Sequence, residues 1–182
     1  MRIPLKRLSD LATVSYYLVM RTMSRSNPIR QARTQAGRTL AQASIEAGVH
    51  LQAFFLQEQG VYPNLLPAVQ AWLVVHEYSL PEALDGYHEY QRGKRRANGE
   101  RLGLSILELG PPLGNPILEL RGQLRLSRMG LAKEFCIHPG TLYRCETGIS
   151  RRLPRQLRDA LKDGGMSEDV LNDLAYRMEE VG

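Results

Sequence analysis

Two stretches of this chain carry the same pattern of residues, displaced by 88 positions without a gap. Nine positions are identical between residues 27–60 and residues 115–148. The first copy has Asn27, Pro28, Ile29, Arg33, Gln35, Glu46, His50, Glu58 and Gly60, and the second has Asn115, Pro116, Ile117, Arg121, Gln123, Glu134, His138, Glu146 and Gly148. Because the shared residues include helix-starting and helix-ending types, we infer an internal duplication and expect two similar domains.

The second copy has the residue pattern of short helices separated by a tight turn. Within residues 115–152, one apolar-periodic run is followed by two short helical patterns, which are separated by a break at Cys136–His138. Gly148 stands where a left-handed residue would close the last of these helices. Two short helices joined by a turn of three or four residues, rich in Arg and poor in acid, are typical of a helix-turn-helix.

This segment resembles the phage-repressor family of DNA-binding domains (Cro/C1, or XRE). The residues that carry the resemblance are Asn115-Pro116-Ile117, Leu126-Ser127, Leu131-Ala132 and Glu146-Thr147-Gly148. The resemblance implies an all-α protein with two tandem lambda-repressor-like helix-turn-helix domains and an N-terminal helix. It also implies a partly buried ion pair in each domain, Arg33 with Glu58 and Arg121 with Glu146, which fixes helix orientation and does no chemistry.

The expected organisation has four parts. Residues 1–26 form a helical extension, residues 27–91 the first domain, residues 92–114 a basic and Pro/Gly-rich linker, and residues 115–182 the second domain. In the extension, Leu11, Val14, Tyr17 and Leu18 recur at helical spacing. This helix could pack on the first domain or on a second subunit, and the sequence does not decide between them.

The start of the linker is strongly basic. Residues 92–101 hold five basic residues and one acid, a balance of 5 − 1 = +4. Two interpretations stay open. The segment is a solvated helix end with a linker, or Lys94, Arg95 and Arg96 form an arm that contacts phosphates or the minor groove.

Charge elsewhere is divided between a basic face and an acidic tail. Residues 121–158 hold nine Arg or Lys against two acids, and residues 159–182 hold two against seven, so their balances are +7 and −5. This distribution favours a polyanionic partner. No charge-free run is long enough to span a membrane, and a signal peptide is not expected. The two cysteines fall at core positions, which indicates reduced thiols in a cytoplasmic protein.

The resemblance implies which side chains contact DNA. In the family the third helix lies in the major groove, so His138, Gly140 and Thr141 form its leading turn and Arg144 can bind guanine O6 and N7. Ser127 caps the second helix, where Arg128 replaces the family's usual Gln. The three arginines Arg151, Arg152 and Arg155 would bind phosphates.

The first copy lacks these side chains. Leu40, Ala53 and Leu56 occupy the positions of Arg128, Thr141 and Arg144, and only Gln52 could reach a base edge. The first domain is therefore expected to be a scaffold or self-association module, with weak DNA contact as the alternative.

The expected function is sequence-specific binding of double-stranded DNA by a transcriptional regulator, most simply a repressor. The alternatives are an antitoxin-like adaptor, which binds a protein or a second copy through the first domain or the N-terminal helix, and an architectural protein of low sequence preference. No enzyme activity, metal or cofactor is expected, because Cys136, His138 and Cys145 lack zinc-site spacing and no catalytic motif is present.

Overall fold

All the regular structure in the described part of the chain is helical, as the sequence predicted. The structure is a computed structural model that describes residues 26–110 and 114–180. Its helices are α2 (Pro28–Gln35), α3 (Leu40–Glu46), α4 (Leu51–Glu58), α5 (Pro67–Val75), α6 (Leu80–Leu102), the 3-10 helix η1 (Leu104–Ile106), α7 (Pro116–Gln123), α8 (Arg128–Phe135), α9 (Pro139–Glu146), α10 (Arg155–Asp163) and α11 (Glu168–Glu180). The predicted N-terminal helix lies outside the described residues, as do residues 111–113 of the predicted linker.

The helices repeat at the spacing found in the sequence. Helices α2 to α6 begin at residues 28, 40, 51, 67 and 80, and α7 to α11 begin at 116, 128, 139, 155 and 168, each 88 positions later. Left-handed backbone conformations recur at the same spacing, at Gly37 and Arg125, Gly48 and Cys136, Gly60 and Gly148, and Glu77 and Gly165. The duplication inferred over 34 positions therefore extends through five helices. We call α2–α5 with the first half of α6 the first unit, and α7–α11 the second unit.

The duplicated asparagines explain why both units begin in the same way. Asn27 and Asn115 cap α2 and α7, each accepting a hydrogen bond from the backbone N–H two residues later. Each also donates to the third helix of its unit, Asn27 Nδ2 to Gln57 O at 2.9 Å and Asn115 Nδ2 to Cys145 O at 2.8 Å. The two acceptor residues are again 88 apart. In each unit, one asparagine side chain thus caps the first helix and also hydrogen-bonds to the third helix.

Each unit has its own apolar core. The first is built around Phe54, Trp72 and Tyr87, and the indole of Trp72 packs edge-on against Phe54 with ring centroids 5.4 Å apart. The second is larger and includes Phe135, Leu142, Leu157, Leu161 and Leu174, together with Leu104 from η1. Because Leu104 precedes α7, the core of the second unit depends on residues from the predicted linker.

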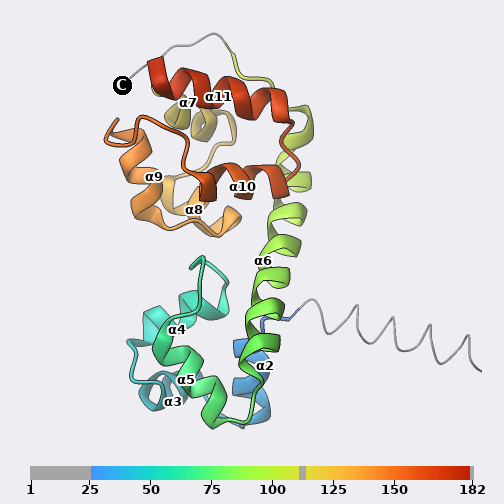
Figure 1. Cartoon of the computed structure of the whole chain (residues 1–182), viewed down its shortest axis with the longest axis vertical. Coiled ribbons are helices and arrows are strands. Elements are labelled where there is room, and N and C mark those ends of the chain that lie inside the picture. The colour runs from blue at the N-terminus through green and yellow to red at the C-terminus, as the bar shows by residue number, and fades with distance from the viewer. Residues whose placement is uncertain (1–25, 111–113, 181–182) are drawn as a thin grey trace, which may run out of the picture.

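Helix α6 joins the two units. Figure 1 shows it running from the helices of the first unit to those of the second, and it packs against α2, α5, α8 and α10. Residues 92–102, the first part of the predicted linker over residues 92–114, continue α6, which ends at Gly103 in a left-handed conformation. The reason is tertiary contact. A Cβ on Gly99 would lie 1.7 Å from Gly164 O, so only glycine allows this approach of α6 to the end of α10.

Candidate nucleic-acid interface

Helices α8 and α9 occupy the segment in which the sequence predicted a helix-turn-helix. They are joined by Cys136, Ile137 and His138, and Cys136 takes the left-handed conformation at φ 55°. Ser127 caps α8 as predicted, and His138 caps α9. Ser127 Oγ accepts from Gly130 N at 3.0 Å, and His138 Nδ1 accepts from Gly140 N at 3.1 Å. The buried side chains Ile137, Leu142 and Cys145 then fix the rotation of α9, so its opposite face is exposed.

A buried carboxylate fixes α9 from behind. Glu146, at the end of α9, is 8% exposed and pairs with Arg121 of α7, whose Nε is 2.7 Å from Glu146 Oε1. The matching pair of Arg33 and Glu58 also forms in the first unit, so both predicted ion pairs are confirmed. In the second unit Arg128 Nη2 adds a contact at 2.5 Å to Glu146 Oε2. A buried carboxylate needs such partners, and here they hold three helices together.

Arg128 also contacts an aromatic ring, and this contact limits how freely its guanidinium can bind a ligand. Besides pairing with Glu146, its guanidinium carbon lies 5.0 Å from the centre of the Tyr143 ring. Its side chain remains 38% exposed. Arg128 is therefore held over the surface of α9 by a carboxylate and an aromatic ring, and part of its charge is already compensated.

The exposed face of α9 has one uncompensated cation. Arg144 is exposed and forms no ion pair or side-chain hydrogen bond within the described residues. Thr141, one helical turn earlier, is half-buried, and Tyr143 beside Arg144 is 48% exposed. This face can donate hydrogen bonds from the guanidinium of Arg144 and from the hydroxyls of Thr141 and Tyr143, and Gly140 adds no side chain to it.

The three arginines after α9 all point into solvent. Arg151 has no ion-pair partner within residues 26–110 and 114–180. Arg152 and Arg155 are 89% and 94% exposed, with acidic neighbours at 3.9 Å (Glu179) and 3.6 Å (Asp159). Exposed ion pairs of this kind contribute little free energy. All three guanidinium groups therefore stay available to an anionic ligand.

The first unit touches the start of α9. The ring of Tyr62, in the loop after α4, lies 6.1 Å from the ring of His138 at a tilt of 34°. Helix α6 holds this loop, because Tyr87 Oη donates to Tyr62 O at 2.8 Å and Gln91 Nε2 donates to Gly60 O at 3.0 Å. His138 thus serves as a helix cap and as a contact between the units, and only its exposed edge is left for DNA.

Lys94 and Arg95, for which one interpretation of the sequence was a DNA-contacting arm, make intramolecular contacts. Lys94 Nζ donates to Gln59 O at 2.7 Å, and burial lowers the pKa of its amine. Arg95 is 12% exposed and donates to Phe135 O at 3.0 Å and to Asp163 Oδ2 at 2.9 Å. Lys94 thus binds the first unit and Arg95 binds the second unit. Arg96, one position further round α6, is exposed.

The corresponding surface of the first unit is apolar. Leu51 and Phe55 on α4 are 45% and 41% exposed, and Ile45 on α3 is 78% exposed. Gln52 is exposed and is the polar side chain of this face that the sequence predicted. The two units therefore present different chemistry on helices that match in position.

The two cysteines are buried thiols. Cys136 and Cys145 are free and buried, and burial raises the pKa of Cys145 to about 11 and that of Cys136 as well. Within the described ranges, no group of three His, Cys, Asp or Glu side chains could hold a metal ion. Likewise, no helix in these ranges has the length and apolar character to cross a membrane.

Comparisons with models of protein families, with curated proteins and with solved structures find no match for this chain.

Proposed function

We propose that the protein is a sequence-specific double-stranded DNA-binding regulator built from two tandem lambda-repressor-like helix-turn-helix domains. The observation that carries this proposal is the exposed face of α9, where Arg144 has no acidic partner among the described residues and three solvent-exposed arginines follow. In such a domain α9 enters the major groove and α8 crosses the backbone.

The roles of the side chains follow from their positions. Arg144 binds a guanine through O6 and N7, and Thr141 contacts a thymine methyl group or a phosphate. Arg151, Arg152 and Arg155 bind phosphates, which positions the domain without specifying sequence. Arg128, already paired with Glu146, contributes long-range attraction and a single backbone contact. Bound across a promoter, the protein represses transcription by excluding the polymerase.

The first unit serves this function as a scaffold. Its exposed leucine and phenylalanine side chains on α4 cannot hydrogen-bond to base edges, so we assign sequence reading to the second unit. Helix α6 then fixes the position of the first unit relative to α9.

Low sequence preference is the second candidate. Pro139 and Gly140 supply no polar side chain to the leading turn of α9, whereas the arginines around it are numerous. An architectural DNA-binding protein would use these arginines on any duplex, with affinity that falls steeply with salt.

Selection of binding sites from a random duplex pool tests the proposal. A selected site should bind at least about a thousandfold more tightly than scrambled DNA at physiological salt. A ratio near one, with a steep salt dependence, would support the architectural candidate instead. Absence of binding to any duplex would rule out both.

A further inference from the structure

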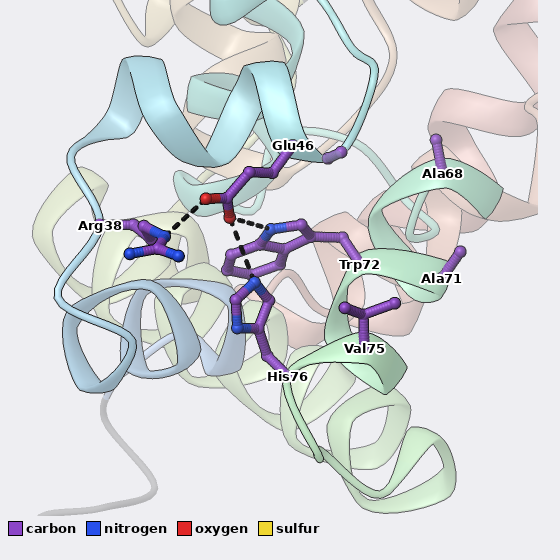
Figure 2. Close-up of a pocket in the computed structure, with 8 residues that line it drawn as sticks. Arg38, Glu46, Ala68, Ala71, Trp72, Val75 and His76 are labelled. Carbon is purple, nitrogen blue, oxygen red and sulfur yellow. Dashed lines mark hydrogen bonds and ion pairs between the residues drawn. The ribbon is translucent and has the colours of Figure 1, made fainter.

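An open groove lies on the first unit between α3 and α5. It has a volume of about 610 Å³, and its apolar lining consists of Ala47, Ala68, Ala71, Trp72 and Val75 (Figure 2). Val75 is 76% exposed, whereas Val69, Trp72 and Leu73 on the same helix are buried. An exposed valine above an alanine-lined groove is a surface suited to another apolar element.

The polar rim of the groove is rigid. Glu46 accepts a hydrogen bond from Trp72 Nε1 at 3.1 Å, lies 3.2 Å from His76 Nε2 and pairs with Arg38 Nε at 2.5 Å (Figure 2). The hydrogen bond from Trp72 is the main reason that the pKa of Glu46 is below its ordinary value. One carboxylate thus holds three side chains in place, so the groove is preformed.

The matching face of the second unit is covered by the second half of α6. Arg95 donates to Phe135 O, Asn98 donates to Glu134 O at 2.8 Å, and Gly99 packs on Gly164. These contacted residues stand 88 positions after Ala47, Glu46 and His76, which line the groove. The covering helix comes from the chain immediately before the second unit.

The chain immediately before the first unit shares a basic pair and two apolar positions with the chain before the second unit, at the same spacing. Residues 4–16 stand 88 positions before residues 92–104, and the adjacent pair Lys6-Arg7 is identical to Lys94-Arg95. Leu102 and Leu104 pack on or in the second core, and Val14 and Tyr16 occupy the matching positions. The apolar residues of this segment also recur at helical spacing.

We propose that residues 4–20 form a helix that docks in the groove between α3 and α5 of the same chain, as α6 docks on α8 and α10. The occupant is the chain's own N-terminal segment, because it stands before the first unit where α6 stands before the second. Arg7 then takes the place of Arg95 and donates to Ala47 O, the equivalent of Phe135 O. This interaction surface is independent of the proposed function.

The docking contact differs from its counterpart in a defined way. His76 replaces Gly164, so the helix cannot approach the end of α5 as closely as Gly99 approaches α10. Ala68 and Ala71 replace Gln156 and Asp159, which opens room along the side of α5 for larger apolar side chains such as Leu11. In the proposed contact with α5, apolar packing therefore replaces part of the polar contact that α6 makes with α10 in the second unit.

Amide hydrogen exchange on the full chain tests the proposal. Amides within residues 6–20 should be protected at least about tenfold relative to an unstructured peptide. Ala71→Arg puts a charged side chain into the groove and should abolish this protection. Val74→Arg is the matched control, since Val74 is exposed on the same helix but does not line the groove. Protection should persist in this control.

Each other outcome overturns the proposal. If the amides of residues 6–20 exchange at the rate of an unstructured peptide in the unmodified chain, the N-terminal segment does not occupy the groove. Equal protection in Ala71→Arg and the unmodified chain would place the segment elsewhere. Protection that disappears on dilution, together with a change in oligomeric state, would assign the groove to the N-terminal segment of a second copy.

Discussion

At the scale of single residues, Arg144 and Arg151 are both exposed cations with no acidic partner in the described chain. They differ in where the backbone holds them. Arg144 stands on the exposed face of α9, whose rotation is fixed by Leu142 and Cys145 beneath it, and Arg151 stands in the loop that follows. A guanidinium held on a fixed helix can read a base edge, whereas one on a loop follows the phosphates of any duplex.

Substitution of these two arginines separates base contacts from phosphate contacts. Arg144→Ala should reduce the preference for a selected site over scrambled DNA by about 1–3 kcal/mol, and Arg151→Ala should weaken both duplexes alike. Titration of both duplexes at several salt concentrations measures the two effects. If both variants lose the same affinity on every sequence, the assignment of Arg144 to base reading is wrong.

At the scale of elements, residues 92–102 of the expected linker belong to α6, which makes specific contacts with both units. Lys94 and Arg95, neighbours in sequence, bind backbone carbonyls of the first and second unit respectively. Gly99 then lets the helix backbone approach Gly164. The charges and glycines of this helix predicted a solvated helix end and linker. In the structure, Lys94 and Arg95 instead bind groups within the protein.

Two glycines on α6 test this account. Gly99→Ala should destabilise the protein by about 1–3 kcal/mol, because its Cβ would collide with the Gly164 carbonyl and push α6 from α10. Gly93→Ala, on the same helix with open space around it, should stabilise by about 0.5–1 kcal/mol. Urea denaturation measures both. Stabilisation by both substitutions would mean that α6 does not pack on α10 in solution.

At the scale of the whole molecule, the two units are not independent modules joined by a tether. Leu104 is 1% exposed and belongs to the core of the second unit, although it precedes that unit in sequence. Tyr62 of the first unit meets His138 at the start of α9. Stability of the second unit and the position of its exposed helix therefore both depend on parts of the chain outside it.

Substitutions of Leu104 and Ile106 in η1 test how far the stability of the second unit depends on this 3-10 helix. Leu104→Ala should cost about 3 kcal/mol of unfolding free energy, because it leaves a cavity in the second core. Ile106→Ala removes a side chain that is 83% exposed and should change stability by less than about 0.5 kcal/mol. Hydrogen exchange in α7–α11 would locate the loss. Similar small effects of both substitutions would show that the second unit is complete without η1.

The sequence alone determined the features that depend on local chemistry. Asn-Pro starts, the Ser127 cap and apolar spacing predicted helical elements, and the family resemblance of the duplicated segments implied both ion pairs. These features follow from residues close in the chain or from a pattern that appears twice. Where the later helices share few identical residues, the sequence did not reveal the repeat, because a core accepts many apolar side chains of suitable volume.

The tertiary structure decided which charges remain available to a ligand. Arg95 and Arg144 are the same residue type in comparably basic stretches, yet one is used within the protein and the other is exposed. That difference depends on whether an acceptor from a distant segment, such as Phe135 O, lies within reach. Long-range proximity is a property of the packed molecule, and neither composition nor periodicity encodes it locally.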